Sequence, residues 1–336
     1  MTRFLVGLRL TFQYVATLVV TTLRRISGRP ARPSWSIGDE ARAMFLRGFW
    51  RRLDALPPAA RRRELESVPV LLPTALLRTR RTRAQLAGVP VTWVAPRGLF
   101  EPRLLLYVHG GAFTVGSSHM VRDLLARLAL ASRCRVLSVD YRLAPEHPWP
   151  AALEDVRAVW QAALVEHAAK QVVLAGDSAG GNLALSLLCA LRDAGEPRPA
   201  GAVLLSPWVD LRCRAASFTT NADADFLDVA ASRRDAEGYA GGRDLGHPAL
   251  SPLEANLAGL PPLYLQAGGA ELLRDDVEAL ASKARAAGVH TALDIWEDQV
   301  HDFQTFGALS RTSLEAIARA GEAVQVFTPV LKMARS

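Results

Sequence analysis

A serine held between two glycines is the first stretch of this chain that could do chemistry. Ser178 lies in Gly176-Asp177-Ser178-Ala179-Gly180, a G-x-S-x-G pattern between a strand-like run at 172–175 and a helical period at 179–191. A strand that turns directly into a helix strains its central residue and requires small flanking residues. The hydroxyl then projects at a helix N-terminus, where a base can reach it and N–H groups favour negative charge. The structural alternative is a tight turn that only happens to contain serine.

A second glycine-rich stretch precedes this serine by about 70 residues. Gly110 and Gly111 lie in the sequence YVHGGAF, directly after the strand-like run at 104–109. Consecutive N–H groups without side chains suit an oxyanion hole, because nothing blocks their approach to a developing alkoxide. A glycine pair after a strand is also found in simple loops, but here it has the chain order that nucleophile-elbow hydrolases require.

The elements that must position these residues alternate between strands and helices. Such alternation predicts an α/β fold with a mostly parallel sheet covered by helices on both faces. Reactive groups in such folds lie at the carboxyl ends of the strands, which is where Ser178 falls. We expect strands at 91–95, 104–109, 136–139, 172–175, 202–206, 263–267 and 291–296, and helices at about 119–132, 151–168, 179–194, 275–287 and 311–327.

Three stretches together resemble the hormone-sensitive-lipase-like family of α/β-hydrolases, over about residues 85–330. They are HGGAF at 109–113, DYRLAPEHP at 140–148 and GDSAGGN at 176–182. The resemblance implies an α/β-hydrolase fold with a helical cap. It implies Ser178 as the nucleophile, and the N–H groups of Gly110, Gly111 and Ala179 as the oxyanion hole. It also implies that His109 has a structural role.

The general base must be one of seven histidines. The chain order of this fold, serine then acid then histidine, leaves His247, His290 and His301. His301 follows the strand expected at 291–296 and matches the family's loop before the last helix. His247 lies in a glycine-rich loop and His290 at the start of a strand, so both are better explained as surface or packing residues. We therefore assign the base to His301.

The triad acid is where the sequence departs from the family pattern. The family generally shows D-P-L-x-D, and this chain has Glu271-Leu272-Leu273-Arg274-Asp275. Aligning the leucine of the motif places Glu271 in the acid's position, thirty residues before His301. Either carboxylate can orient an imidazole and stabilise its cation. We favour Glu271 and keep Asp275 as the alternative, although an acid in the first turn of the next helix also has a structural explanation.

Composition indicates a folded globular protein with an uneven charge distribution. The net charge is +7, and residues 1–103 contain 19 arginines but only six acidic residues. Basic clusters at 61–63 and 78–83 lack any recognised nucleic-acid-binding module, so we expect no nucleic-acid partner. Cys134, Cys189 and Cys213 form no disulfide framework and are expected to be buried thiols, which favours a reducing compartment.

The N-terminal segment 4–23 is largely apolar but is interrupted by Arg9 and Gln13, so it is marginal as a membrane span of about 20 residues. One interpretation is a helix whose apolar stripe packs on the main domain. A second is peripheral or single-span membrane anchoring at the inner face of the membrane, and otherwise a cytoplasmic location is expected. A cleaved signal is disfavoured, because arginines follow the run and no small-x-small site does. The stripe consists of Phe4, Leu8, Phe12, Val15 and Val19.

We divide the chain into an N-terminal helical cap segment at 1–85 and a catalytic domain at 86–330 with a cap insertion at about 210–259. Both cap segments fall outside the strand and helix alternation. Their aromatic side chains either line an acyl pocket or are ordinary core residues. These aromatics are Phe45, Phe49, Trp50, Trp208, Phe218 and Phe226.

Taken together, these residues predict a serine hydrolase that cleaves short to medium acyl or acetyl esters through an acyl-enzyme. Its expected partner is a small-molecule ester, and the chemistry requires neither a metal nor an organic cofactor. Two alternatives stay open: a non-catalytic protein of the same fold that binds a small ligand, and an acyltransferase with the same triad.

Overall fold

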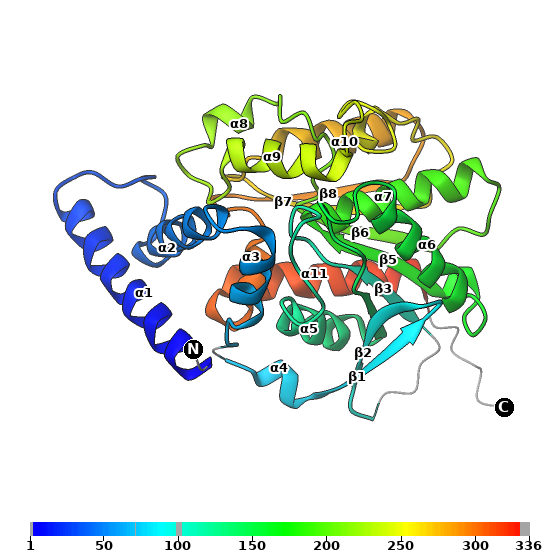
Figure 1. The fold of residues 1–336 in the computed structure, drawn as a ribbon, viewed down its shortest axis with the longest axis horizontal. Coiled ribbons are helices and arrows are strands. Elements are labelled where there is room, and N and C mark those ends of the chain that lie inside the picture. The colour runs from blue at the N-terminus through cyan, green and yellow to red at the C-terminus, as the bar shows by residue number, and fades with distance from the viewer. Residues whose placement is uncertain (1–2, 71, 99–102, 330–336) are drawn as a thin grey trace.

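An eight-stranded β-sheet forms the centre of the protein in the computed structural model, which describes residues 3–70, 72–98 and 103–329 (Figure 1). Its strand order is β1-β2-β4-β3-β5-β6-β7-β8. β3 to β8 are parallel to one another, whereas β2 pairs antiparallel with both β1 and β4. The strands are β1 Thr79–Leu86, β2 Val89–Pro96, β3 Leu104–Val108, β4 Arg135–Val139, β5 Val172–Asp177, β6 Gly201–Leu205, β7 Leu263–Gly268 and β8 Thr291–Trp296.

Helices cover both faces of this sheet, as the alternation of strands and helices along the sequence predicted. Every residue of β3 and β5 is buried, which is the pattern of strands that are covered on both sides. The helices α5 (Arg122–Ser132) and α11 (Arg311–Phe327) pack on one face. The other face is covered by α6 (Ala151–Ala163), α7 (Ser178–Asp193) and α10 (Arg274–Ala286). The predicted α/β-hydrolase fold is confirmed.

One strand lies where the sequence analysis expected only helices. β1 falls inside the 1–85 segment and forms a hairpin with β2, so the sheet begins before residue 86. Its sequence, TRRTRAQL, has no alternating apolar residues, and six of its eight residues are exposed. Charged side chains on an edge strand discourage pairing with other chains. This position on the sheet edge explains the arginines Arg80, Arg81 and Arg83.

The remaining helices belong to the two segments that were expected to form a cap. The first segment contributes α1 (Arg3–Ile26), α2 (Ile37–Asp54), α3 (Pro58–Glu66) and α4 (Thr74–Leu77), of which α1 lies at the left edge of Figure 1 and α4 at its lower edge. α2 begins with a capping box between Ser36 and Asp39. The insertion contributes α8 (Ser217–Thr220) and α9 (Val229–Ala240). The described residues also include three short 3₁₀ helices: η1 Ala169–Gln171, η2 Pro252–Glu254 and η3 Phe303–Leu309.

The apolar stripe of α1 faces outward, opposite to the interpretation in which it packs on the main domain. Leu8, Phe12, Val15 and Val19 are all more than half exposed, and the side chain of Phe4 lies outside the described residues. The inward side of α1 is a different row of residues that includes Val6 and Thr21. By length and composition, Val6–Ile26 is long and apolar enough to cross a membrane.

The three cysteines are buried and none of them forms a disulfide, as the sequence predicted. Burial raises the pKa of the Cys189 thiol to about 11 and that of the Cys213 thiol to about 12. Both side chains therefore stay protonated at neutral pH and are poor nucleophiles.

Candidate active site

Ser178 lies at the turn from β5 into α7, where the G-x-S-x-G pattern placed it. Its φ of +49° is in the left-handed region, the strained conformation expected at this turn. A Cβ at Gly180 would lie 2.0 Å from the carbonyl oxygen of Val108, and one at Gly176 would lie 2.5 Å from the backbone of Gly180. Larger residues at either position would displace the backbone, so the glycines are required to present the serine.

His301 is in contact with this serine. It follows β8 and precedes η3, and its Nε2 atom lies 2.9 Å from Ser178 Oγ. Both side chains are buried. His247 and His290 are exposed, in keeping with surface roles. A serine hydroxyl within hydrogen-bond distance of a buried imidazole is the pair that nucleophilic catalysis requires.

Glu271, and not Asp275, is the acid that faces this histidine. The Oε1 atom of Glu271 lies 4.0 Å from His301 Nδ1, and neither atom has a hydrogen-bond partner. The other carboxylate oxygen, Oε2, accepts hydrogen bonds from the Ser206 hydroxyl at 2.7 Å and from the Gly268 N–H at 2.8 Å. The carboxylate is therefore held in place with one oxygen directed at the imidazole. Asp275 instead accepts a hydrogen bond from Ser217 N–H and pairs with Arg274.

The oxyanion loop differs from the expectation at one position. The N–H of Gly110 donates to Asp177 Oδ1 at 3.0 Å, so it is not available to a substrate oxygen. Gly111 and the next residue, Ala112, line the cavity over Ser178. His109 supports the loop, because its Nδ1 donates to the Gly110 carbonyl at 2.8 Å and its ring stacks on Tyr141.

Asp302 is a second carboxylate at the site that sequence reasoning missed. Its Oδ2 atom lies 3.2 Å from His301 Nε2, and its Oδ1 atom is buried without a hydrogen-bond partner. Burial raises the pKa of Asp302, and burial together with the nearby Asp302 raises the pKa of Asp177 to about 7. Burial by itself would lower the pKa of His301, but the carboxylates of Asp302 and Glu271 outweigh it and raise that pKa well above its ordinary value.

Asp225 is a further unpredicted residue, and it joins the two loops of the triad. Its Oδ1 accepts a hydrogen bond from the His301 N–H at 3.1 Å, and its Oδ2 accepts one from the Leu272 N–H at 2.8 Å. Its own carbonyl accepts two hydrogen bonds from Arg47 of α2. Nothing in the sequence marks Asp225, because it lies in an irregular part of the insertion and acts through backbone groups.

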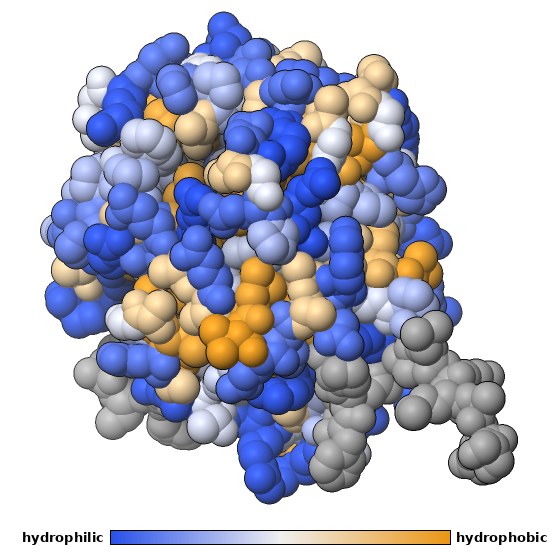
Figure 2. Space-filling view, turned by 90° about the vertical axis from the view of Figure 1, so that its right-hand side faces the viewer, coloured by the Kyte–Doolittle hydropathy of each residue, from blue (hydrophilic) through white to orange (hydrophobic). Residues whose placement is uncertain are grey.

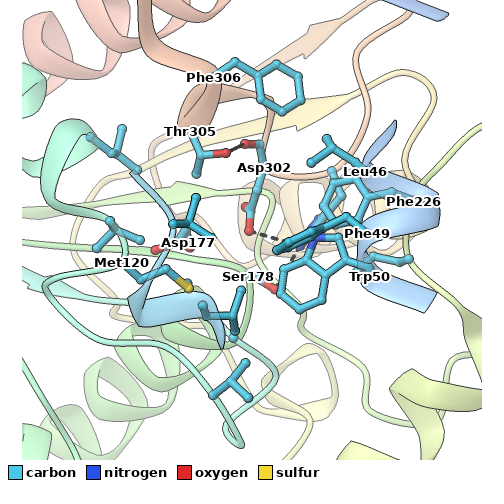
Figure 3. Close-up of a pocket in the computed structure, with 18 of the residues that line it drawn as sticks. Leu46, Phe49, Trp50, Met120, Asp177, Ser178, Phe226, Asp302, Thr305 and Phe306 are labelled. Atoms are coloured by element: carbon cyan, nitrogen blue, oxygen red, sulfur yellow. Dashed lines mark hydrogen bonds and ion pairs between the residues drawn. The ribbon is translucent and has the colours of Figure 1, made fainter. Parts of the chain in front are cut away.

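A cavity of about 530 Å³ opens above Ser178 (Figure 3). It is lined mainly by apolar side chains from the N-terminal segment, the insertion and the loop after β8. Figure 3 shows Ser178 and Asp302 near its centre, with the rings of Phe49, Trp50 and Phe226 close by. Five of the six predicted aromatics line the cavity: Phe45, Phe49, Trp50, Trp208 and Phe226. The sixth, Phe218, is buried elsewhere. In the described part of the chain, no group of three or more His, Cys, Asp or Glu residues is arranged to hold a metal ion.

Known proteins resemble this chain in sequence. Residues 105–305 match a family described as having the alpha/beta hydrolase fold. An acetyl-hydrolase from Streptomyces hygroscopicus is 42% identical over 238 residues, which are 70% of this chain and 79% of the relative. The carboxylesterase NlhH from Mycobacterium tuberculosis is 33% identical over 273 residues, 77% of this chain and 85% of the relative.

A solved structure agrees with these relatives. An esterase of the bacterial hormone-sensitive lipase family superposes with a TM-score of 0.80 at 38% identity, over 88% of this chain and 99% of that one. The chain is an α/β-hydrolase, and it belongs to the hormone-sensitive-lipase-like family of esterases that its motifs resembled.

Proposed function

We propose that this protein hydrolyses carboxylic esters with Ser178 as nucleophile. The observation that carries the proposal is the 2.9 Å contact between His301 Nε2 and Ser178 Oγ at the base of an apolar cavity. The cavity suits the acyl or alcohol part of an ester, and the contact supplies the activated hydroxyl. The relatives named as an acetyl-hydrolase and a carboxylesterase support the same activity.

The reaction proceeds in two half-reactions. In the first, Ser178 Oγ attacks the ester carbonyl carbon while its proton passes to His301 Nε2. The resulting imidazolium gives this proton to the leaving alcohol, and the acyl group stays on Ser178. In the second, a water molecule gives a proton to the same nitrogen and attacks the acyl carbon; the bond to Ser178 then breaks, His301 returns the proton to Ser178 Oγ, and the acid is released. Glu271 faces Nδ1 throughout and stabilises the imidazolium.

The oxyanion is stabilised by backbone N–H groups of the glycine loop and of the α7 N-terminus. Ala179 is the second residue of α7, where an N–H has no partner within the helix. Gly111 supplies a second donor. Because the Gly110 N–H is held by Asp177, we assign the third donor to Ala112, which lines the cavity beside Gly111. These donors complement the charge that develops on the carbonyl oxygen.

Short to medium acyl esters are the proposed substrates. The cavity of about 530 Å³ has room for more than an acetyl group, and the rings of Phe49, Trp50 and Phe226 bound it near the nucleophile. Apolar walls reward each methylene that leaves water, which favours longer chains until the cavity is filled.

The test compares wild type with Ser178→Ala on p-nitrophenyl acetate, butyrate and octanoate, and follows burst and steady-state release. We expect turnover in wild type and a loss of about 10³-fold or more in the variant. Turnover that survives Ser178→Ala would overturn the proposal. Absence of turnover in wild type, with ligand binding intact, would favour a binding protein. Preferential transfer to an added alcohol instead of water would identify an acyltransferase.

A further inference from the structure

The outward face of α1 is a continuous apolar surface that no part of the described chain covers. Among the described side chains of α1, seven large apolar ones are exposed, and Phe12 and Ile26 are 75% and 78% exposed. Their spacing of three or four residues places most of them in one row along the helix. At a rise of 1.5 Å per residue, the row extends over about 27 Å from Leu8 to Ile26. The seven are Leu8, Phe12, Val15, Val19, Val20, Leu23 and Ile26.

The opposite side of the molecule is different. Figure 2 looks onto the side that lies at the right of Figure 1, away from α1, and hydrophilic residues predominate there with only small hydrophobic groups between them. The exposed apolar row of α1 is therefore not typical of the surface of the whole protein. An exposed apolar surface of this size marks a site of interaction.

Charge indicates what covers this face. Residues 1–38 contain six arginines and no aspartate or glutamate. Arg24 and Arg29, at and just after the end of the helix, are exposed. An apolar helix face with basic residues at its end is complementary to a bilayer that carries anionic headgroups. A second copy of this segment would bring arginines against arginines.

The inward face of α1 shows that the helix stays attached to the protein. Arg25 Nε donates to Glu40 Oε2 at 2.8 Å, and the Glu40 side chain is fully buried. Arg9 pairs with Glu64, and Tyr14 packs edge-on against Phe45 of α2. Crossing the bilayer would remove the charged partner of Glu40, Arg25, and carry Arg9 into the lipid, which is costly. In-plane docking requires neither.

We propose that α1 docks flat on the surface of an anionic phospholipid bilayer through this apolar row. The row enters the region between headgroups and acyl chains, and Arg24 and Arg29 contact lipid phosphates. Binding consequently depends on both apolar area and salt concentration.

Docking in this orientation places the substrate cavity beside the bilayer. Leu10, Thr11 and Tyr14 of α1 line the cavity, so one helix forms both a cavity wall and the membrane-facing surface. Together with the proposed esterase function, this arrangement implies that esters dissolved in the bilayer are accessible substrates. The docking itself does not depend on that function.

The experiment measures co-sedimentation of the full chain with vesicles of phosphatidylcholine, either pure or containing about one-third phosphatidylglycerol. The test variant is Phe12→Asp combined with Val19→Asp, which alters the outward row and no cavity-lining residue. The matched control is Val165→Asp, the same kind of change at an 85% exposed valine after α6. Hydrolysis of soluble p-nitrophenyl butyrate reports folding and tests the proposed function separately.

We expect wild type and Val165→Asp to bind the anionic vesicles. The double variant should bind at least about 10-fold more weakly. Pure phosphatidylcholine and high salt should each weaken wild-type binding. The proposal is overturned if wild type does not bind anionic vesicles, or if the double variant binds as well as wild type. It is also overturned if wild type forms a dimer that the double variant loses while neither binds vesicles, because a second copy then covers the row.

Discussion

The Oδ2 atom of Asp302 lies 3.2 Å from His301 Nε2, the same nitrogen that lies 2.9 Å from Ser178 Oγ. One imidazole nitrogen therefore faces both the nucleophile and a buried carboxyl group. A carboxylate beside Nε2 stabilises the protonated form of this nitrogen. Nε2 must be unprotonated before it can accept the proton of Ser178. In the proposed mechanism, Glu271 faces Nδ1 and stabilises the imidazolium without occupying Nε2. The two acids thus act on the histidine in different ways.

Asp302→Asn is expected to shift the acid limb of the pH profile of kcat/KM to lower pH. Asp302 raises the pKa of His301, and the proposed mechanism requires Nε2 to be unprotonated before it can accept the Ser178 proton. Removing the negative charge lowers that pKa and extends activity toward acid. Asparagine tolerates the positive φ of 47° at this position, so the backbone should be retained.

The measurement is kcat/KM for a soluble p-nitrophenyl ester across the acid limb. Asp298→Asn is the matched control, because Asp298 lies in the same loop and does not line the cavity. An unchanged limb in Asp302→Asn, or an equal shift in both variants, would show that Asp302 does not tune the base.

Glu271→Gln is expected to lower kcat by about 10³-fold to 10⁴-fold with little change in KM. Glutamine keeps the shape of the side chain but cannot stabilise the imidazolium through charge. Asp275→Asn, four residues further on, should keep most of the activity because Asp275 contacts Ser217 and Arg274 rather than His301. Steady-state kinetics of both variants decide the assignment, and the reverse pattern would transfer the role to Asp275.

Asp225→Asn is expected to impair both stability and turnover. The carboxylate accepts three backbone N–H groups: Oδ1 accepts those of Phe226 and His301, and Oδ2 accepts that of Leu272. An asparagine has only one side-chain oxygen, so its amide NH₂ would face at least one of these N–H groups, at a cost of about 1–3 kcal/mol in the free energy of unfolding. Loosening the His301 loop should lower kcat more than it changes KM, because the cavity walls stay in place.

Urea unfolding and steady-state kinetics test this prediction together. Asp223→Asn is the control, since Asp223 is an exposed neighbour in the same segment. A destabilised variant with full kcat would mean that Asp225 only supports folding and does not position the histidine.

The residues that sequence reasoning identified are those whose positions follow from regular elements. Ser178 follows a buried strand and opens a helix, and His301 follows the last strand, so chain order alone relates them. β1 escaped prediction because an edge strand rich in arginine has no apolar alternation. Asp225 could not be found because its contact with His301 spans 76 residues through a backbone N–H.

Two points concern orientation, which periodicity does not determine: the side of α1 that contacts the domain, which the sequence left open, and the oxyanion donors, where Gly110 was assigned wrongly. α1 has apolar residues on both of its faces, so the 3.6-residue period predicts a helix but not which side contacts the domain. In the oxyanion loop, both glycines satisfy the motif. Only the position of Asp177 shows that the N–H of Gly110 is already in use.

Trp50→Ala is expected to shift the preference of the enzyme toward longer acyl chains. The Trp50 ring lines the cavity and stacks on Phe226 with ring centroids 5.9 Å apart, so its removal enlarges the apolar space near the nucleophile. Each additional methylene that becomes buried is worth about 0.8 kcal/mol, and three or four of them amount to a change of about 100-fold. Incomplete burial reduces this to an expected rise of about 10-fold in the octanoate to acetate ratio of kcat/KM.

Trp93→Ala is the control, because Trp93 lies on β2 and does not line the cavity. A ratio that stays constant in Trp50→Ala would place the acyl chain elsewhere and assign this wall of the cavity to the alcohol group.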